Sequence, residues 1–263
     1  MTSIYQALHE LESNFKTATL CTVVKTSGST PRHSTSKMIV YPDGSIIGSV
    51  GGGGLENQVI SEALICQKSG LARLLEYKMT DPERGDVGIC GGQVMIYIEP
   101  IQPAPLVVVI GGGHVGKAVA HLAKWLGYRI AISDDRPLFC TPEANPDADF
   151  FIPVEMKDIP ANLEIDEHTY LILTTRGVSV DKDGLPSLIM TRAGYIGVIG
   201  SRKRWAETVK HLKSMGISSQ EISKIHAPIG LEIHAETPEE IAVSIMAEIV
   251  TINRNLSQTG GKK

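Results

Sequence analysis

A short apolar run followed at once by a glycine-rich loop constrains the fold of this chain most. All five residues of Leu106–Ile110 are aliphatic, which is typical of a strand buried on both faces of a parallel sheet. The next six, 111–116, read Gly-Gly-Gly-His-Val-Gly, and an alanine-rich helical pattern continues from them to Leu126. A strand, a glycine loop and a helix in this order begin a Rossmann-type sheet, so we expect a nucleotide-binding domain in the second half.

The glycines of the loop have the Gly-x-Gly-x-x-Gly spacing of a dinucleotide site. Gly111 would turn the chain, Gly113 would let the backbone approach a pyrophosphate, and Gly116 would let the helix pack on the strand. The helix begins near His114 and Val115, and the free N–H groups of its first turn would face the phosphates. The alternative is a glycine turn that serves packing alone, because a fold does not establish a working site.

Three charged residues at the end of the next predicted strand bear on the choice of nucleotide. Asp134 lies about 20 residues after Gly113, where a carboxylate can bind ribose hydroxyls. Asp134 and Asp135 would repel a 2′-phosphate and so favour NAD. Arg136 could accept that phosphate, which leaves NADP or another adenine nucleotide open. A solvated loop is the alternative for Asp135 and Arg136.

The rest of the second half alternates strand and helix patterns, as in a doubly wound parallel sheet. Strands are expected at 128–133, 150–152, 169–174 and 195–199, with helices near 183–190 and 201–215 and a last helix that starts at Thr237-Pro238. We therefore assign 106–254 to the Rossmann nucleotide-binding domain and 255–263, which is polar and glycine-rich, to a flexible tail.

The first half has the pattern of a separate α+β domain, 1–100. A helix is expected over 4–15 and another from 55 to 64, with strands at 19–25, 38–41, 45–48, 71–78 and 93–99. Prolines at 103 and 105 mark a stiff linker over 101–105. The fold class is thus α/β, with an N-terminal α+β domain followed by a Rossmann-type doubly wound parallel-sheet domain.

Composition and charge narrow the function classes. The net charge of -4 argues against a general nucleic-acid surface, and no stretch approaches the roughly 20 apolar residues of a membrane span. The start of the sequence lacks a leader pattern, so we expect a cytoplasmic protein. Its four cysteines have no Cys-x-x-Cys spacing, which fits reduced thiols and predicts no metal site.

Two loops of the first half are candidate sites. The stretch 25–37 is rich in hydroxyls and carries Lys25, Ser29, Arg32 and Lys37, which could cradle a phosphate; an exposed connection is the equal alternative.

The second candidate combines glycine runs at 51–54 and 88–92. Glu56 follows the first run and could cap a helix, and Cys90 lies within the second. Cys90 is an accessible nucleophile on one interpretation and a buried structural thiol on the other.

Ordered motifs along nearly the whole chain resemble the XdhC/CoxI family, whose members mature molybdenum hydroxylases such as xanthine dehydrogenase. They are Gly-Ser-Thr-Pro-Arg at 28–32, Gly-Ser-Val at 48–50 with Glu56, Cys-Gly-Gly at 90–92, Glu-Pro at 99–100, the glycine loop 111–116, Asp-Asp-Arg-Pro at 134–137, Thr-Arg-Gly at 175–177, Tyr-Ile-Gly at 195–197, Ile-Gly-Ser-Arg at 199–202, Pro-Ile-Gly-Leu at 228–231 and 235–242. The chain departs from the family at Gly54, where a cysteine is typical, and after Gly177, where a histidine is common.

The resemblance implies an accessory protein rather than a stand-alone enzyme. Such a protein would bind the molybdenum cofactor as cargo, promote its sulfuration with a cysteine desulfurase and deliver it to a hydroxylase client, with Cys90 as the thiol that ligates molybdenum or accepts persulfide. A homodimer would help to enclose the cargo. The alternatives are an NAD(P)-dependent oxidoreductase and a nucleotide-sensing regulator without turnover.

Overall fold

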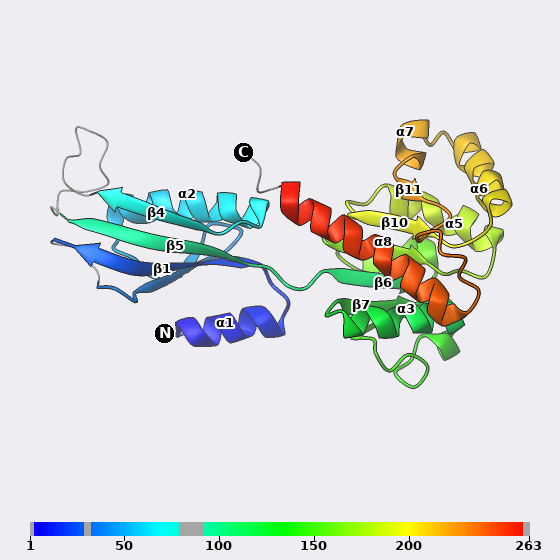
Figure 1. Ribbon diagram of the computed structural model, residues 1–263, viewed down its shortest axis with the longest axis horizontal. Helices are drawn as coiled ribbons and strands as arrows, with labels where there is room; N and C mark the ends of the chain where they lie inside the picture. Colours follow the sequence, from blue (N-terminus) through cyan, green and yellow to red (C-terminus); the bar gives the residue numbers. More distant parts are fainter. Residues whose placement is uncertain (1–2, 29–32, 79–91, 260–263) are drawn as a thin grey trace. The chain divides into compact units, whose positions relative to one another are not determined.

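The computed structural model describes residues 3–28, 33–78 and 92–259, and the chain divides into two compact units. One unit contains the chain up to Pro103, and the other is Ala104–Arg254 (Figure 1). Within the described residues, no helix combines the length and apolar character that crossing a membrane requires. Each unit has a sheet and buried clusters of its own, so each is described separately.

The first unit is built on an antiparallel sheet in the order β3-β2-β1-β5-β4. Its elements are α1 (Ile4–Ser13), β1 (Ala18–Ser27), β2 (Lys37–Val40), β3 (Ile46–Gly48), α2 (Gly53–Ser69), β4 (Arg73–Lys78) and β5 (Gln93–Ile101). The largest cluster forms where Leu55, Val59 and Ala63 of α2 meet apolar side chains of β1 and β5. Ser3 caps α1 in a capping box with Gln6, which explains why the helix begins there.

The second unit contains a parallel six-stranded sheet in the order β11-β10-β9-β6-β7-β8. The strands are β6 (Leu106–Ile110), β7 (Arg129–Ser133), β8 (Phe150–Ile152), β9 (Thr169–Leu173), β10 (Tyr195–Val198) and β11 (Ile225–His226). Counted along this unit, the order is 3-2-1-4-5-6 read from β8, the order of a Rossmann fold. The predicted fold class is therefore confirmed.

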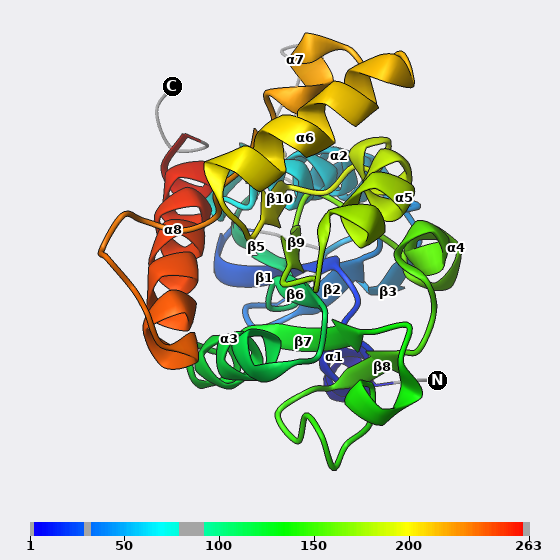
Figure 2. The ribbon, with the colours of Figure 1, turned by 90° about the vertical axis from the view of Figure 1, so that its right-hand side faces the viewer.

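Helices cover both faces of this sheet (Figure 2). They are α3 (His114–Trp125), η2 (Pro137–Phe139), η3 (Met156–Asp158), α4 (Ile159–Asn162), α5 (Val178–Ile189), α6 (Arg202–Ser214), α7 (Ser219–Ile222) and α8 (Pro238–Thr259). One buried cluster joins α3 and α8 to the sheet, and another joins α4, α5 and α6 to its opposite face. Every residue of β6 and β9 is buried, as expected for strands between two helical layers.

Several boundaries differ from those predicted. Helix α5 begins at Val178 rather than near 183. Its first turn buries the polar Asp181 and has no apolar stripe, so the hydrophobic pattern did not reveal that turn. Helix α8 continues to Thr259, past the start of the predicted tail 255–263; residues 260–263 lie outside the described part. Strand β5 ends at Ile101, inside the predicted linker 101–105. The short elements α4, α7 and β11 have too few residues to show a period.

A buried ion pair fixes α5 and α6 to the end of β9. Asp181 is fully buried; one of its oxygens accepts the Thr175 hydroxyl at 2.5 Å and the other accepts Arg204 Nε at 2.9 Å. Arg204 Nη2 also donates to the Thr175 hydroxyl at 2.5 Å. A buried charge with all of its partners is tolerated, whereas the removal of one partner leaves the other uncompensated.

Asp181→Ala should therefore lower the free energy of unfolding by about 3 kcal/mol, because Arg204 loses its buried counter-charge. Urea denaturation followed by circular dichroism measures the change. The matched control is Glu207→Ala, which removes an exposed carboxylate paired with Lys182 between the same two helices and should cost less than about 1 kcal/mol. Equal losses in the two variants would contradict a special role for the buried pair.

Candidate functional site

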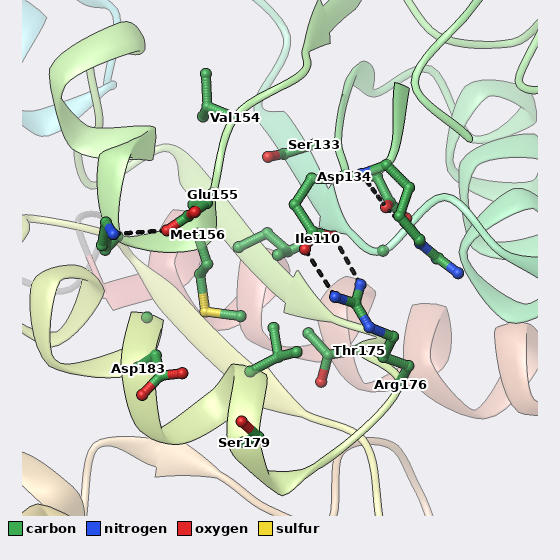
Figure 3. Close-up of a pocket in the computed structure, with 16 residues that line it drawn as sticks. Ile110, Ser133, Asp134, Val154, Glu155, Met156, Thr175, Arg176, Ser179 and Asp183 are labelled. Carbon is green, nitrogen blue, oxygen red and sulfur yellow. Dashed lines mark hydrogen bonds and ion pairs between the residues drawn. The ribbon is translucent and has the colours of Figure 1, made fainter. Parts of the chain in front are cut away.

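A cavity of about 240 Å³ opens at the carboxyl ends of the Rossmann strands (Figure 3). Its walls come from the loops after β6, β7, β8 and β9 and from the first turns of α5. They combine apolar and charged side chains: Ile110, Val154, Met156, Val180, Asp134, Asp135, Arg136, Glu155, Lys157, Arg176 and Asp183. Ligands of open α/β sheets bind in the crevice at this edge, where the order of the strands reverses.

The three glycines of the loop meet different surroundings. Gly111 has φ +115°, and a Cβ there would lie 2.7 Å from the Thr174 carbonyl oxygen. A Cβ on Gly116 would lie 1.9 Å from the Gly111 carbonyl oxygen, so this position is filled by close packing of α3. Gly113 is the N-cap of α3, and a Cβ there would meet no atom within 4 Å. The open space in this loop is thus at Gly113, beside the N-terminus of the helix.

The predicted ribose-binding residue Asp134 is committed to the protein framework. Its side chain is 2 % exposed, and Oδ2 accepts the Gly112 N–H at 2.9 Å. Oδ1 accepts the backbone N–H of Arg136 at 3.0 Å and its Nε at 2.9 Å. The carboxylate therefore joins the glycine loop to the turn after β7, and a ribose contact from it stays a prediction that would require these bonds to change.

Arg136 and Asp135 point to different partners. Arg136 lies over the Phe139 ring, 4.0 Å from its centroid, while it holds Asp134. Asp135 pairs with Arg176 through two hydrogen bonds of 2.6 and 2.7 Å. This ion pair lowers the pKa of Asp135 and raises that of Arg176, because each charge is stabilised by the other.

The remaining predicted residues of the glycine loop lie beside the cavity rather than in its walls. Gly111 is part of the walls, whereas Gly113, His114, Val115 and Gly116 are not among the described lining residues. His114 is exposed as the first residue of α3, and Val115 is partly buried. Sequence patterns did not single out Arg176 or Met156 as site residues, since their loops join the site only through the fold; Thr-Arg-Gly at 175–177 was the available signal for Arg176.

The predicted residues of the first unit are only partly visible. Ser29, Arg32 and Cys90 lie outside the described residues. Lys25 is exposed on β1, and Lys37 on β2 donates from Nζ to the Thr22 hydroxyl at 3.1 Å. A phosphate contact from these cations therefore stays a prediction.

Glu56 has a definite structural role near the start of α2. Its Oε1 accepts the Ser49 hydroxyl at 2.5 Å and the Val50 N–H at 3.2 Å. Burial opposes ionisation of this carboxyl, but the hydrogen bonds from Ser49 and from the backbone of 50–52 outweigh it and lower the pKa of Glu56. The carboxylate thus organises the glycine run 51–54, and a cofactor contact from it stays a prediction.

The three described cysteines are all buried. Burial raises the pKa of Cys21 to about 12, and it also raises the pKa of Cys66 and Cys140. Thiols of this kind are poor nucleophiles at neutral pH. In the described part of the chain, no group of three or more His, Cys, Asp or Glu side chains is arranged to hold a metal ion.

Family models match both units. The model described as "XdhC Rossmann domain" matches 107–249, and the model described as "XdhC and CoxI family" matches 14–78. A crystal structure from Bacillus halodurans, named a xanthine dehydrogenase, is similar with a TM-score of 0.52 and 20% identity over 95% of each chain. At this identity the structural likeness supports the fold alone.

Curated relatives come from two bacteria. Uncharacterized protein YqeB of Escherichia coli K12 is 33% identical over 96% of this chain, and a probable xanthine dehydrogenase subunit from Bacillus subtilis 168 is 30% identical over 62%. The chain spans about half of each of these two, 47% of their lengths. The molybdenum cofactor insertion chaperone PaoD of Escherichia coli K12 is 25% identical over 90% of this chain and 84% of its own length.

Asp134→Ala should destabilise the second unit by about 2–4 kcal/mol, because the Gly112 N–H and the Arg136 guanidinium lose a buried acceptor. The measurement is the midpoint and slope of urea denaturation. Asp135→Ala is the neighbouring control, and its exposed ion pair predicts a loss below about 1 kcal/mol. A fully stable Asp134→Ala protein would reject the framework role.

The lowered pKa of Glu56 predicts a dependence of stability on pH. Because the folded pKa lies below the unfolded one, the carboxylate stabilises the fold above the unfolded pKa and loses this contribution as the pH falls through the folded pKa. Melting temperatures of the wild type should therefore fall more steeply than those of Glu56→Gln between about pH 5 and pH 3. Parallel curves for the two proteins would contradict this assignment.

Proposed function

The chain belongs to the XdhC and CoxI family, and from that premise we propose that it is an accessory protein that binds the molybdenum cofactor and helps to insert it into a molybdenum hydroxylase. The relative named a molybdenum cofactor insertion chaperone supports this, because its alignment extends over both units. The relative from Bacillus subtilis, named as part of a probable xanthine dehydrogenase, supports a client of that class.

The observation that carries the nucleotide part of the proposal is the cavity at the switch point of the Rossmann sheet, with open space at Gly113. The residues fit an adenine nucleotide such as NAD or NADP: a glycine loop with open space at Gly113, the N-terminus of a twelve-residue helix, and apolar walls beside carboxylates. Gly111, Gly113 and the first turn of α3 would hold the phosphates. Bound there, a nicotinamide nucleotide could supply redox chemistry. An adenine nucleotide without a nicotinamide would instead act as a regulatory ligand, whose occupancy depends on its concentration.

The finer proposal for the first unit is that its basic loop holds the phosphate of the pterin cofactor. Lys25 and Lys37 are available on β1 and β2, and Ser29 and Arg32 lie between them in sequence. Charge-assisted contacts to phosphate are strong, and exposed ones weaken with salt. Arg32→Ala should then reduce cofactor retention and flatten its dependence on salt.

Sulfuration is a further part of the proposal, with Cys90 as the thiol that ligates molybdenum or accepts persulfide from a cysteine desulfurase. Cys21, Cys66 and Cys140 are buried with raised pKa values, which leaves Cys90 as the remaining candidate among the four cysteines of the sequence. The resemblance to the family implies a cysteine at the position where this chain has Gly54, so no second thiol is available there. We further propose a homodimer, which would enclose the cargo until it is transferred.

The nucleotide site is tested with Gly113→Val. Gly113 has φ -73°, a value that valine adopts, and a Cβ there meets no atom within 4 Å, so the variant should fold normally. Its side chain would occupy the space for the phosphates and should weaken NAD binding at least tenfold in calorimetry. Undiminished binding by a folded Gly113→Val protein would place the nucleotide elsewhere.

The accessory role is tested by expressing the protein with a xanthine dehydrogenase-type client in a host that makes molybdenum cofactor. The purified protein should carry molybdenum and pterin, and the client should lose activity when Cys90→Ser replaces the wild type at equal abundance. Cys140→Ser, a change at a buried thiol, is the control and should leave client activity unchanged. Turnover of NAD(P)H by the isolated protein, without cofactor or client, would instead identify an oxidoreductase.

A further inference from the structure

The two carboxylates that follow β7 differ in how accessible they are to a ligand. Asp134 is 2 % exposed, and both of its oxygens are occupied by the glycine loop and by Arg136. Asp135 is 33 % exposed, lines the cavity and is paired with the side chain of Arg176. A ligand that enters the cavity can therefore reach Asp135 without dismantling the loop.

The partner of Asp135 comes from across the sheet. Asp135 follows β7 and Arg176 follows β9, and these strands lie on either side of β6. Their ion pair therefore spans the carboxyl end of β6 from one side to the other, at the cavity. Since β6 leads into the glycine loop, this is where a nucleotide would cross from its phosphates to its ribose.

The ion pair between Asp135 and Arg176 is well oriented, but it is also exposed to solvent. Two parallel N–H···O contacts of 2.6 and 2.7 Å fix the orientation of both side chains. Arg176 is nevertheless 48 % exposed. An ion pair in contact with water contributes little net stability, because water solvates both charged groups when the pair separates. A ligand with hydroxyl donors can therefore displace the guanidinium at small cost.

From this arrangement we infer that Asp135, not Asp134, receives the ribose hydroxyls of a nucleotide without a 2′-phosphate, and that Arg176 is a latch that covers Asp135 until the ligand displaces it. The inference rests on the nucleotide function proposed above and names the residues that recognise the ligand. A 2′-phosphate would meet the charge of Asp135. Arg136, which could otherwise accept it, is held by Asp134 and lies over Phe139, so NAD should be preferred to NADP.

Calorimetric titration of the full chain with NAD and with NADP, at one fixed salt concentration, tests the latch. Asp135→Asn should weaken NAD about tenfold or more and bring the affinities for NAD and NADP close together, because it loses a charged acceptor and a repulsive charge. Arg176→Leu should tighten NAD by about two- to fivefold, because the competitor for Asp135 is gone.

Matched controls come from the exposed pair of Arg192 and Glu167, which lies at the amino ends of β10 and β9, the opposite edge of the sheet. Arg192→Leu and Glu167→Gln change the net charge as the test variants do and should alter NAD affinity by less than about twofold. Thermal melts of all four variants verify that each one is folded.

The outcomes separate the latch from the function on which it rests. If the wild type binds neither nucleotide, the proposed nucleotide function fails and the latch fails with it. If the wild type binds NAD and Asp135→Asn binds it equally well, the latch alone is rejected. Weaker NAD binding by Arg176→Leu would show that Arg176 holds the ligand itself, which also overturns the latch.

Discussion

The hydrogen bond from the Gly112 N–H to the Asp134 carboxylate is the contact on which the second unit's site depends. It joins the loop after β6 to the end of β7, and Arg136 holds the same carboxylate in its orientation. Together with the hydrogen bond from the Gly111 N–H to the Ser133 carbonyl oxygen at 2.8 Å, it positions the glycine loop against the next strand, and Gly113 there presents open space beside α3. A residue expected to touch ligand thus serves first to build the place where a ligand could lie.

Much of the second unit could be predicted because its signals are local. The five aliphatic residues of β6 and the glycine loop lie next to each other in sequence, so strand, turn and helix follow from 20 residues. Arg176 could not be assigned to the site in this way, because its partner Asp135 is 41 residues away and the two meet only when β7 and β9 flank β6. The hydrogen bonds of Asp134 to Gly112 and Arg136 could not be predicted either, because the residue type alone does not indicate which N–H groups surround a carboxylate in the fold.

The first unit shows the limits of motif and spacing more sharply. Its glycine run and Glu56 were recognisable, yet the carboxylate turns inward to Ser49 and the backbone of its own loop. A polar side chain beside a glycine run can therefore bind a ligand or form hydrogen bonds within the protein, and the sequence does not distinguish these two roles. The residues of the proposed cargo site lie before and after this loop in the sequence. Their chemistry must therefore be tested by experiment, whereas the sheet of the first unit could be predicted from local patterns.

The two outermost strands of the Rossmann sheet have a consequence for behaviour at high concentration. Strand β8 has three residues and β11 has two, whereas the interior strands β6, β7 and β9 have five each. Few unpaired backbone groups are thus offered at either margin, and a neighbouring polypeptide finds almost no template for strand addition. The buried interior strands lie between edge strands that are too short to pair with another chain. This arrangement disfavours edge-to-edge aggregation of the folded unit.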